Sequence, residues 1–175
     1  MFARSGFQVV VREINDQLAQ GAKDRLTKDL DKMVSKGKME AAKKDEILGR
    51  MTFTTDLSLA ADAVLIVEAI LERVDLKKGL FKELDDICKP ETIFATNTSS
   101  ISITEIGSGC KRQDKVIGMH FFNPPTVMKL VEVIRGNNTS DATVKAVKAF
   151  AVELGKTPVE VHEAPGFVVN RILVP

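Results

Sequence analysis

Two residues between positions 116 and 133 have the chemistry for proton transfer. His120 ends an apolar run, an Asn-Pro-Pro turn follows at 123–125, and Glu132 lies between two valines in a second apolar run. A carboxylate is costly to bury without a partner, and an imidazole is a natural partner for it. A histidine paired with a carboxylate holds one tautomer and can take or give a proton at physiological pH. Alternatively, the two side chains lie on an ordinary hairpin and never meet.

The composition limits the classes of protein to which the chain can belong. Its 175 residues are 44% hydrophobic and 28% charged, which suits a domain with a hydrophobic core. Because 25 basic residues nearly balance 24 acidic ones, we expect neither a nucleic-acid partner nor a membrane surface. The longest apolar stretch, residues 60–71, is too short to span a bilayer.

The two cysteines, Cys88 and Cys110, form no CxxC pair and have no histidine at ligand spacing. We therefore expect no metal site and expect both thiols to be small core residues. So few cysteines, with no signal peptide ahead of the fold, favour a reducing compartment and a cytoplasmic location.

Hydrophobic periodicity predicts alternating strands and helices. The predicted strands cover residues 7–11, 51–54, 63–67, 92–96, 115–119, 128–134 and 157–161. The predicted helices are a long one capped by Asp16 with Leu18 inward, residues 39–48, one opened by Glu72, a short piece near Thr104, one starting at Asp141, and an apolar one starting at Phe167. Continuously apolar strands are typical of parallel sheets covered on both faces. The order predicts a doubly wound α/β sheet.

Polar residues recur where these predicted strands end. Glu13, Glu72, residues 97–99 and His120 all follow strands. In doubly wound sheets, ligands bind outside the carboxyl ends of the strands. The coincidence of four such strand ends predicts a ligand site at this edge of the sheet.

Four segments resemble one known family. They are NTSS at 97–100, GMHFFNP at 118–124, MKLVE at 128–132 and APGFVVNR at 164–171. In this order they resemble the L-3-hydroxyacyl-CoA dehydrogenase family, in particular its bacterial 3-hydroxybutyryl-CoA branch, and the likeness covers the whole chain. The resemblance implies a Rossmann-type dinucleotide-binding domain. It also implies that NAD oxidises the 3-hydroxyl of a short-chain (S)-3-hydroxyacyl-CoA, or the reverse reduction of a 3-ketoacyl-CoA.

The resemblance implies catalytic roles for individual residues. His120 matches the family's general acid/base, and Glu132 matches the carboxylate that orients it. Ser99 matches the serine near the reacting oxygen and the nicotinamide ribose, and Asn170 matches the asparagine at the thioester end of the substrate. Neutral donors such as these can hold negative charge that develops on oxygen without titrating. His162 matches no motif and is expected to be an exposed loop residue.

Further matches imply contacts with the cofactor and with coenzyme A. Glu13 matches the acid that binds the adenosine ribose hydroxyls, where Asp is commoner, and the adjacent Arg12 keeps NADP possible besides NAD. The other matched cofactor contacts are Glu72, Lys77, Asn97, Ser99 and Asn123. Lys36, and less closely Lys32, match basic positions that meet the phosphates of the acyl-CoA substrate. Alternatively, these two lysines belong to a solvated helix face.

The family pattern extends beyond both ends of the chain. It begins with a strand and a GxGxxG turn that would lie roughly 15 to 20 residues upstream. We therefore expect residues 1–166 to form an NAD-binding and catalytic domain that lacks its first strand and glycine-rich loop. Residues 167–175 would start a helical domain. The missing strand would be the central one of the sheet, so both of its neighbours are left with unpaired backbone groups. Either the two neighbouring strands close the gap between them, or a strand from another copy fills it, or residues outside this sequence do.

Two hypotheses of function follow. The first is an NAD-dependent dehydrogenase, which would be a homodimer at full length, while the assembly of this chain stays open. The second is a catalytically inactive truncated or structural relative on the same scaffold, which the missing glycine loop favours. In either case we expect the 175-residue chain alone to be weakly active or inactive.

Overall fold

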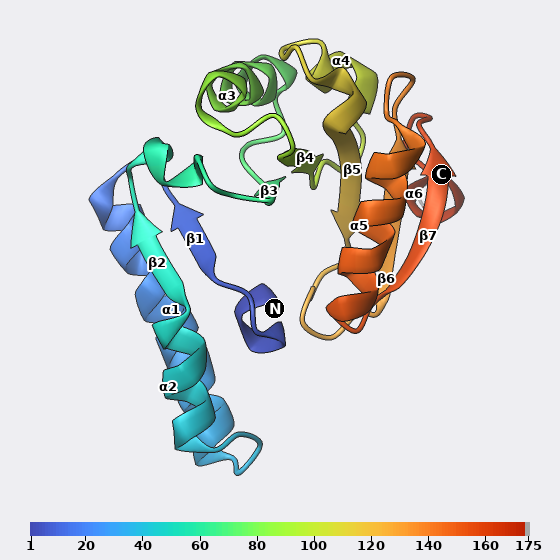
Figure 1. The fold of residues 1–175 in the computed structure, drawn as a ribbon. Helices are drawn as coiled ribbons and strands as arrows, with labels where there is room; N and C mark the ends of the chain where they lie inside the picture. The colour runs from blue at the N-terminus through green and yellow to red at the C-terminus, as the bar shows by residue number, and fades with distance from the viewer. Residues whose placement is uncertain (174–175) are drawn as a thin grey trace. The chain divides into compact units, whose positions relative to one another are not determined.

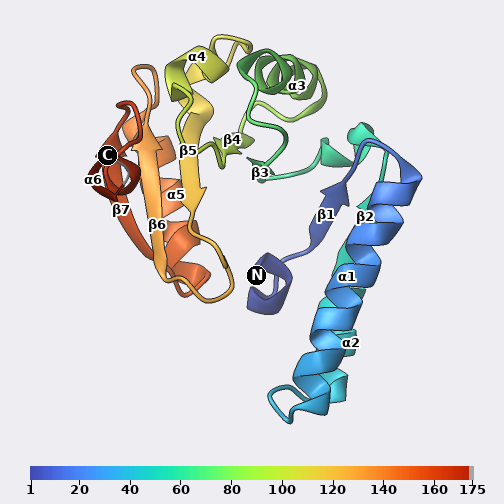
Figure 2. The same cartoon turned by 180° about the vertical axis from the view of Figure 1, so that it is seen from behind.

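The computed structural model describes residues 1–173, which divide into two compact units that meet between Leu59 and Ala60. Helices and strands alternate along the chain (Figure 1), and Figure 2 gives the view from behind. Together they form a mixed α/β fold in which parallel strand pairs predominate. The predicted α/β class is confirmed.

The first unit packs two helices against a two-stranded parallel sheet. Its elements are η1 (Phe2–Ser5), β1 (Val9–Arg12), α1 (Asp16–Ser35), α2 (Ala41–Gly49) and β2 (Met51–Thr54). Strands β1 and β2 pair in register from Val9 opposite Met51. A small apolar cluster of Ala3, Leu30 and Ile47 forms its core. An ion pair of 2.6 Å between Lys44 Nζ and Asp31 Oδ1 joins the two helices.

The second unit is built on a five-stranded sheet in the order β3-β4-β5-β6-β7. Its elements are η2 (Leu57–Ala60, which crosses the boundary), β3 (Leu65–Glu68), α3 (Val74–Ile87), β4 (Ile93–Thr96), α4 (Ile103–Gly107), η3 (Gln113–Lys115), β5 (Val116–Phe121), β6 (Leu130–Arg135), α5 (Asp141–Glu153), β7 (Thr157–His162) and α6 (Val169–Leu173). Only the β5–β6 pair is antiparallel among these described strands. Both views show α5 beside β5 and β6 (Figures 1 and 2).

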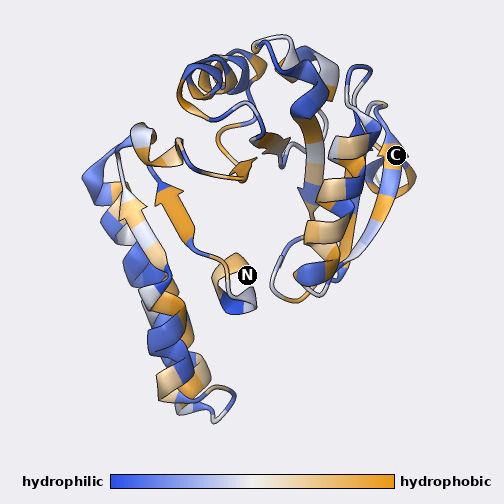
Figure 3. Ribbon diagram, viewed as in Figure 1, coloured by the Kyte–Doolittle hydropathy of each residue, from blue (hydrophilic) through white to orange (hydrophobic). Residues whose placement is uncertain are grey.

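Burial follows the hydrophobic pattern closely in the second unit. Every residue of β4 is buried, and β5 and β6 are buried except at their ends, as predicted for strands covered on both faces. Helix α5 turns Val144, Val147 and Ala151 inward, also as predicted. Colouring by hydropathy shows orange along strands such as β1 and a mixture of blue and orange along the helices (Figure 3). That mixture is typical of helices with one buried face.

Several local predictions were wrong in detail. Asn15, not Asp16, caps α1, because its Oδ1 accepts a hydrogen bond of 2.8 Å from Leu18 N. Leu18 is 39% exposed, and Ala19 takes the inward position. Glu72 precedes α3, which begins at Val74. At Asn15 and Glu72 the polar side chain accepts a hydrogen bond from a backbone N–H, of Leu18 and of Ser99 respectively, rather than extending the helix. Strand ends differ from the predicted ones by at most two residues, and β2 matches its predicted range.

Strands β1 and β3 belong to different sheets, and no described strand pairs with both. Collapse of the predicted gap into one sheet is therefore not observed. The other two alternatives, a strand borrowed from another copy and further residues that complete the sheet, stay predictions. The domain boundary predicted after residue 166 also stays a prediction. Residues 174–175 of the predicted helical segment lie outside the described part.

Two further predictions concern the cysteines and the membrane. Cys88 and Cys110 are free and buried, as predicted. Burial raises the pKa of the Cys110 thiol to about 11, so it stays protonated near neutral pH. Among the described residues, none of the helices combines the length and the apolar character needed to cross a bilayer.

Gly118 in β5 provides the first test of the packing around the sheet. A Cβ there would lie 2.7 Å from Ile134 Cβ and 2.9 Å from Ile103 Cδ1. We predict that Gly118→Ala lowers the free energy of unfolding by about 1–3 kcal/mol, because overpacking forces neighbours to shift. Urea denaturation measures this change.

Gly79→Ala on α3 is the matched control. A Cβ at Gly79 has no heavy atom within 4 Å outside its own helix turn, so this variant should keep or raise the stability. Equal stability of the two variants would contradict the close approach of β5 and β6.

Candidate active site

The antiparallel pairing of β5 and β6 places His120 directly opposite Glu132. Side chains opposite one another in such a pair share one face of the sheet. His120 Nδ1 lies 2.8 Å from Glu132 Oε2, and the two residues are only 5% and 1% exposed. The predicted dyad is therefore formed, and the alternative of a hairpin whose polar residues never meet is wrong. An ionised carboxylate can only accept, so Nδ1 carries the proton and Nε2 is left to accept one.

The second carboxylate oxygen of Glu132 is held by the segment that follows β7. Val168 N and Val169 N donate to Oε1 at 3.1 and 2.9 Å. The preceding Phe167 has a φ of 50°, a left-handed conformation that a bulky residue rarely adopts. Its buried ring lies 5.8 Å from that of His120. Burial and the two amide bonds thus offset the strain and fix the carboxylate in place.

Ser99, in the loop after β4, stands beside the free nitrogen of the dyad. Its Oγ lies 3.3 Å from His120 Nε2. Its backbone is held on both sides, because its N–H donates to Glu72 Oε1 at 2.9 Å and its carbonyl accepts from Asn170 Nδ2 at 3.2 Å. The structure thus brings together His120, Ser99, Asn170 and Glu72, which the sequence had predicted as site residues.

Glu72 has an electrostatic environment that favours its charged form. Partial burial acts to raise the pKa of its carboxyl, but hydrogen bonds from Thr98 Oγ1 and Ser99 N and the nearby Lys77 outweigh it, so the pKa is lowered. Its second oxygen lies 3.2 Å from Lys77 Nζ. The carboxylate can therefore act as an acceptor throughout the physiological pH range.

Lys77 differs from the other predicted cofactor contacts, because its amine is enclosed by the protein. Nζ lies 2.7 Å from Glu68 Oε1 and 3.4 Å from the Ile70 carbonyl, besides its contact with Glu72. Thr96 Oγ1 donates to the other oxygen of Glu68 at 2.7 Å. The predicted contact between Lys77 and a cofactor stays a prediction. Sequence reasoning missed the buried role of Glu68, whose one signal was a charge inside an apolar run.

The two predicted asparagines lie at the ends of neighbouring strands. Asn97 follows β4, and its Oδ1 accepts a hydrogen bond of 2.9 Å from Phe121 N at the end of β5. This bond ties the two strand ends together. Asn123 is exposed in the turn after β5.

The remaining predicted contacts lie in the first unit. Glu13 follows β1, and its N–H donates to Thr54 O at 2.9 Å. Arg12 beside it donates from Nε to the Thr55 carbonyl at 3.3 Å. Lys32 and Lys36 are exposed at the C-terminal end of α1, as either a phosphate-binding or a solvated face requires.

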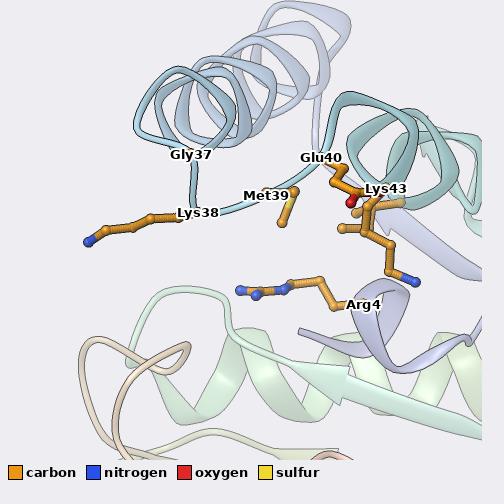
Figure 4. A pocket seen from close by; sticks show the side chains of 7 residues that line it. Arg4, Gly37, Lys38, Met39, Glu40 and Lys43 are labelled. Carbon is orange, nitrogen blue, oxygen red and sulfur yellow. The ribbon is translucent and has the colours of Figure 1, made fainter.

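A hollow of about 650 Å³ also lies in the first unit (Figure 4). Its lining residues are Arg4, Gly37, Lys38, Met39, Glu40, Lys43 and Ile47. Neither Lys32 nor Lys36 contributes to it, and no predicted catalytic residue lies there. This hollow therefore does not coincide with the polar side chains that converge around His120, which mark the candidate site.

Comparison with known families identifies the fold that carries these residues. Residues 1–164 match the family described as the 3-hydroxyacyl-CoA dehydrogenase, NAD-binding domain. The chain belongs to this family. The resemblance inferred from the four motifs is confirmed, and the doubly wound arrangement is that of a Rossmann-type NAD-binding domain.

Three relatives show how far the similarity of this 3-hydroxyacyl-CoA dehydrogenase domain extends. The 3-hydroxybutyryl-CoA dehydrogenase of Clostridioides difficile is 51% identical, over 99% of this chain and 62% of that protein. A probable 3-hydroxybutyryl-CoA dehydrogenase of Bacillus subtilis is 46% identical, over 99% and 60%. The crystal structure of (S)-3-hydroxybutyryl-CoA dehydrogenase from Ralstonia eutropha matches with a TM-score of 0.94 at 43% identity, over 98% and 60%. The chain thus spans about 60% of the length of these relatives.

The buried carboxylate of Glu132 generates a prediction about stability. Glu132→Gln should lower the free energy of unfolding by about 1–3 kcal/mol. The two carboxylate oxygens of Glu132 accept from three donors, whereas a glutamine amide has only one acceptor oxygen. One donor must then lose its partner or face the NH₂ group. Urea denaturation of the purified chain measures the loss.

Glu83→Gln, at an exposed position of α3, is the control and should change the stability by less than about 0.5 kcal/mol. If both variants unfold at the wild-type urea concentration, the amide bonds to Glu132 do not hold the site together.

Proposed function

We propose that this chain supplies the acid–base and NAD-binding part of a dehydrogenase that interconverts a short-chain (S)-3-hydroxyacyl-CoA and the corresponding 3-ketoacyl-CoA. The observation that supports this most is the buried His120–Glu132 pair, whose free ring nitrogen lies 3.3 Å from the Ser99 hydroxyl at the carboxyl ends of β4 and β5. The names of the relatives point to the same substrate class.

In the oxidative direction, His120 acts as the base. Its Nε2 takes the proton of the substrate 3-hydroxyl, and Glu132 holds the Nδ1 proton and stabilises the imidazolium that forms. Bound NAD would supply the acceptor for the hydride that leaves C3. In the reductive direction the protonated ring returns its proton to the carbonyl oxygen, so the same pair serves both directions.

Ser99 and Asn170 serve as neutral polar groups in this scheme. The Ser99 hydroxyl, next to Nε2, can donate to the substrate oxygen while that oxygen carries partial negative charge. Asn170 fixes the Ser99 carbonyl through one amide hydrogen and has a second for the thioester end of the substrate. Neither group titrates, so neither competes with His120 for the proton.

Residues in each unit, taken separately, offer donors and acceptors that suit parts of an NAD molecule. At the strand ends of the second unit, Glu72, Asn97 and Ser99 present acceptors and donors for a ribose and an amide, and Asn123 is exposed in the turn after β5. Glu13, which follows β1, is an acid suited to ribose hydroxyls, so NAD is favoured over NADP. Arg12 keeps NADP as an alternative.

Three further assignments belong to this proposal. Lys36 and Lys32 would meet the phosphates of coenzyme A, since both ammonium groups are exposed. The full-length protein would act as a homodimer. We also expect it to work in the cytoplasm.

The catalytic role of His120 is tested by substitution. Acetoacetyl-CoA and NADH are added to the full-length protein that carries this sequence, and NADH absorbance is followed. His120→Gln should lower kcat roughly 10²–10⁴-fold, the usual range for loss of a general acid or base.

The exposed His162 provides the matched control, because it is the only other histidine in the sequence. His162→Gln should retain wild-type turnover. Absence of turnover in the wild-type protein, or equal activity of the two variants, would refute the proposed function.

A further inference from the structure

Glu163, which directly follows β7, is an acidic residue that the proposed mechanism does not use. Its partly buried carboxylate lies at the start of α4. One oxygen accepts from Thr104 N at 2.9 Å and from Ser102 Oγ at 3.2 Å, and the other accepts from the Thr104 hydroxyl. The N–H of Glu163 donates to the Arg135 carbonyl at 3.1 Å and continues the ladder between β6 and β7. A single residue therefore joins the end of β7 to a helix that begins about 60 residues earlier in the chain.

The start of α4 is also held from a second side. Thr104 Oγ1 accepts from Asn137 N, in the turn after β6, at 2.8 Å. In the same turn, a Cβ at Gly136 would lie 3.2 Å from Thr104 N, so this turn and the helix approach each other closely. Ile103 anchors the helix in the core, where it is 1% exposed. Glu163 thus meets donors whose own positions are fixed, and it cannot shift without losing them.

Glu163 stands at the base of the segment that completes the candidate active site. Residues 164–170 lead from it to the two amides that hold the Glu132 carboxylate. Within this segment, Gly166 and Phe167 have positive φ angles of 73° and 50°. Because a phenylalanine in this conformation is strained, the segment keeps its path only while its surroundings hold it there. Glu163 is the first residue that can do so.

The loop after β4 and the segment after β7 are joined at two places. Near the site, Asn170 Nδ2 donates to the Ser99 carbonyl. Further along the same loop, Ser102 and Thr104 donate to Glu163. One contact alone would let the segment pivot about it, whereas two contacts fix its direction. Such precision matters, because a displacement of about 1 Å at a reacting group can lower a rate by about 10²-fold.

We infer that Glu163 is a positioning residue, which sets the path of residues 164–170 so that their amides hold Glu132 and their asparagine meets Ser99. The inference rests on the proposed function for its catalytic meaning, but the physical link between Glu163 and the amides that bind Glu132 does not. If Glu163 only stabilised the fold, its loss would loosen the whole sheet and not this segment in particular.

The physical link is measured by amide hydrogen exchange in the full-length protein that carries this sequence, followed by mass spectrometry of its peptides. Glu163→Ala should speed exchange in residues 164–172 roughly 10-fold or more. The reason is that the amides that bind Glu132 lose protection when the base of their segment is released. Exchange in residues 130–135, which form β6, should change far less.

Glu160→Ala is the matched control, because Glu160 lies in β7 and pairs with Arg135 and Lys148 instead of with α4. It should leave exchange in residues 164–172 at the wild-type rate. Glu163→Gln keeps one acceptor oxygen for the start of α4 and should give an intermediate rate. Should Glu163→Ala fail to fold, Glu163→Gln carries the same comparison, because it preserves the length and the packing of the side chain.

The catalytic consequence is measured in the same protein with acetoacetyl-CoA and NADH. Glu163→Ala should lower kcat roughly 10–100-fold, while the Kd for NADH measured by fluorescence stays unchanged. In a His120→Gln background the same substitution should cause little further loss, because residues that act through one catalytic group are not additive. Glu163→Gln should recover part of the activity.

The outcomes separate this inference from the proposed function. Exchange that rises equally in residues 164–172 and 130–135, or that does not rise at all, would overturn the positioning role. An unchanged kcat, or losses that multiply in full in the His120→Gln background, would overturn it as well. A wild-type protein that shows no turnover would refute the proposed dehydrogenase, and hydrogen exchange would then decide the physical link by itself.

Discussion

The register of β5 against β6 is the constraint on which the site depends. A slip of one residue would turn Glu132 to the opposite face of the sheet and leave both members of the dyad without a partner. Gly118, two residues before His120, secures that register, because it pairs with Ile134 and the space where its Cβ would lie is filled by Ile134 and Ile103. The glycine of the GMHFFNP motif therefore acts on the catalytic pair through packing.

The sequence was a good guide where function coincides with strong hydrophobic patterning. Continuous apolar runs located β4, β5 and β6, and the dyad followed from a histidine and a glutamate set into two such runs. The inward face of α5 was correct for the same reason. Element ends were less predictable, since Asn15 binds the backbone of the first turn of its helix, while Glu72 binds the N–H of Ser99 in the loop after β4.

The contacts that the sequence did not reveal join residues far apart in the chain. Nothing local distinguishes Lys77 from its exposed neighbours on α3, and its burial depends on Glu68 in a different element. The amides of Val168 and Val169 reach Glu132 only because Phe167 adopts a left-handed backbone, which a phenylalanine does not signal. A resemblance could assign roles to Glu132 and Asn170, but the amide bonds that hold Glu132 are visible only in coordinates.

These distant contacts converge on Ser99 and on the free nitrogen of His120. Glu72 holds the Ser99 N–H and Asn170 holds its carbonyl, while the backbone just before Asn170 holds Glu132. The segment after β7 thus acts on both the base and the serine beside it. Within the described part of the chain, no buried side-chain polar atom lacks a hydrogen-bond partner. In a fully satisfied hydrogen-bond network of low dielectric, moving one member weakens the hydrogen bonds of its neighbours. Displacement of Glu72 or of the segment after β7 would therefore change the hydrogen bonding at His120 Nε2.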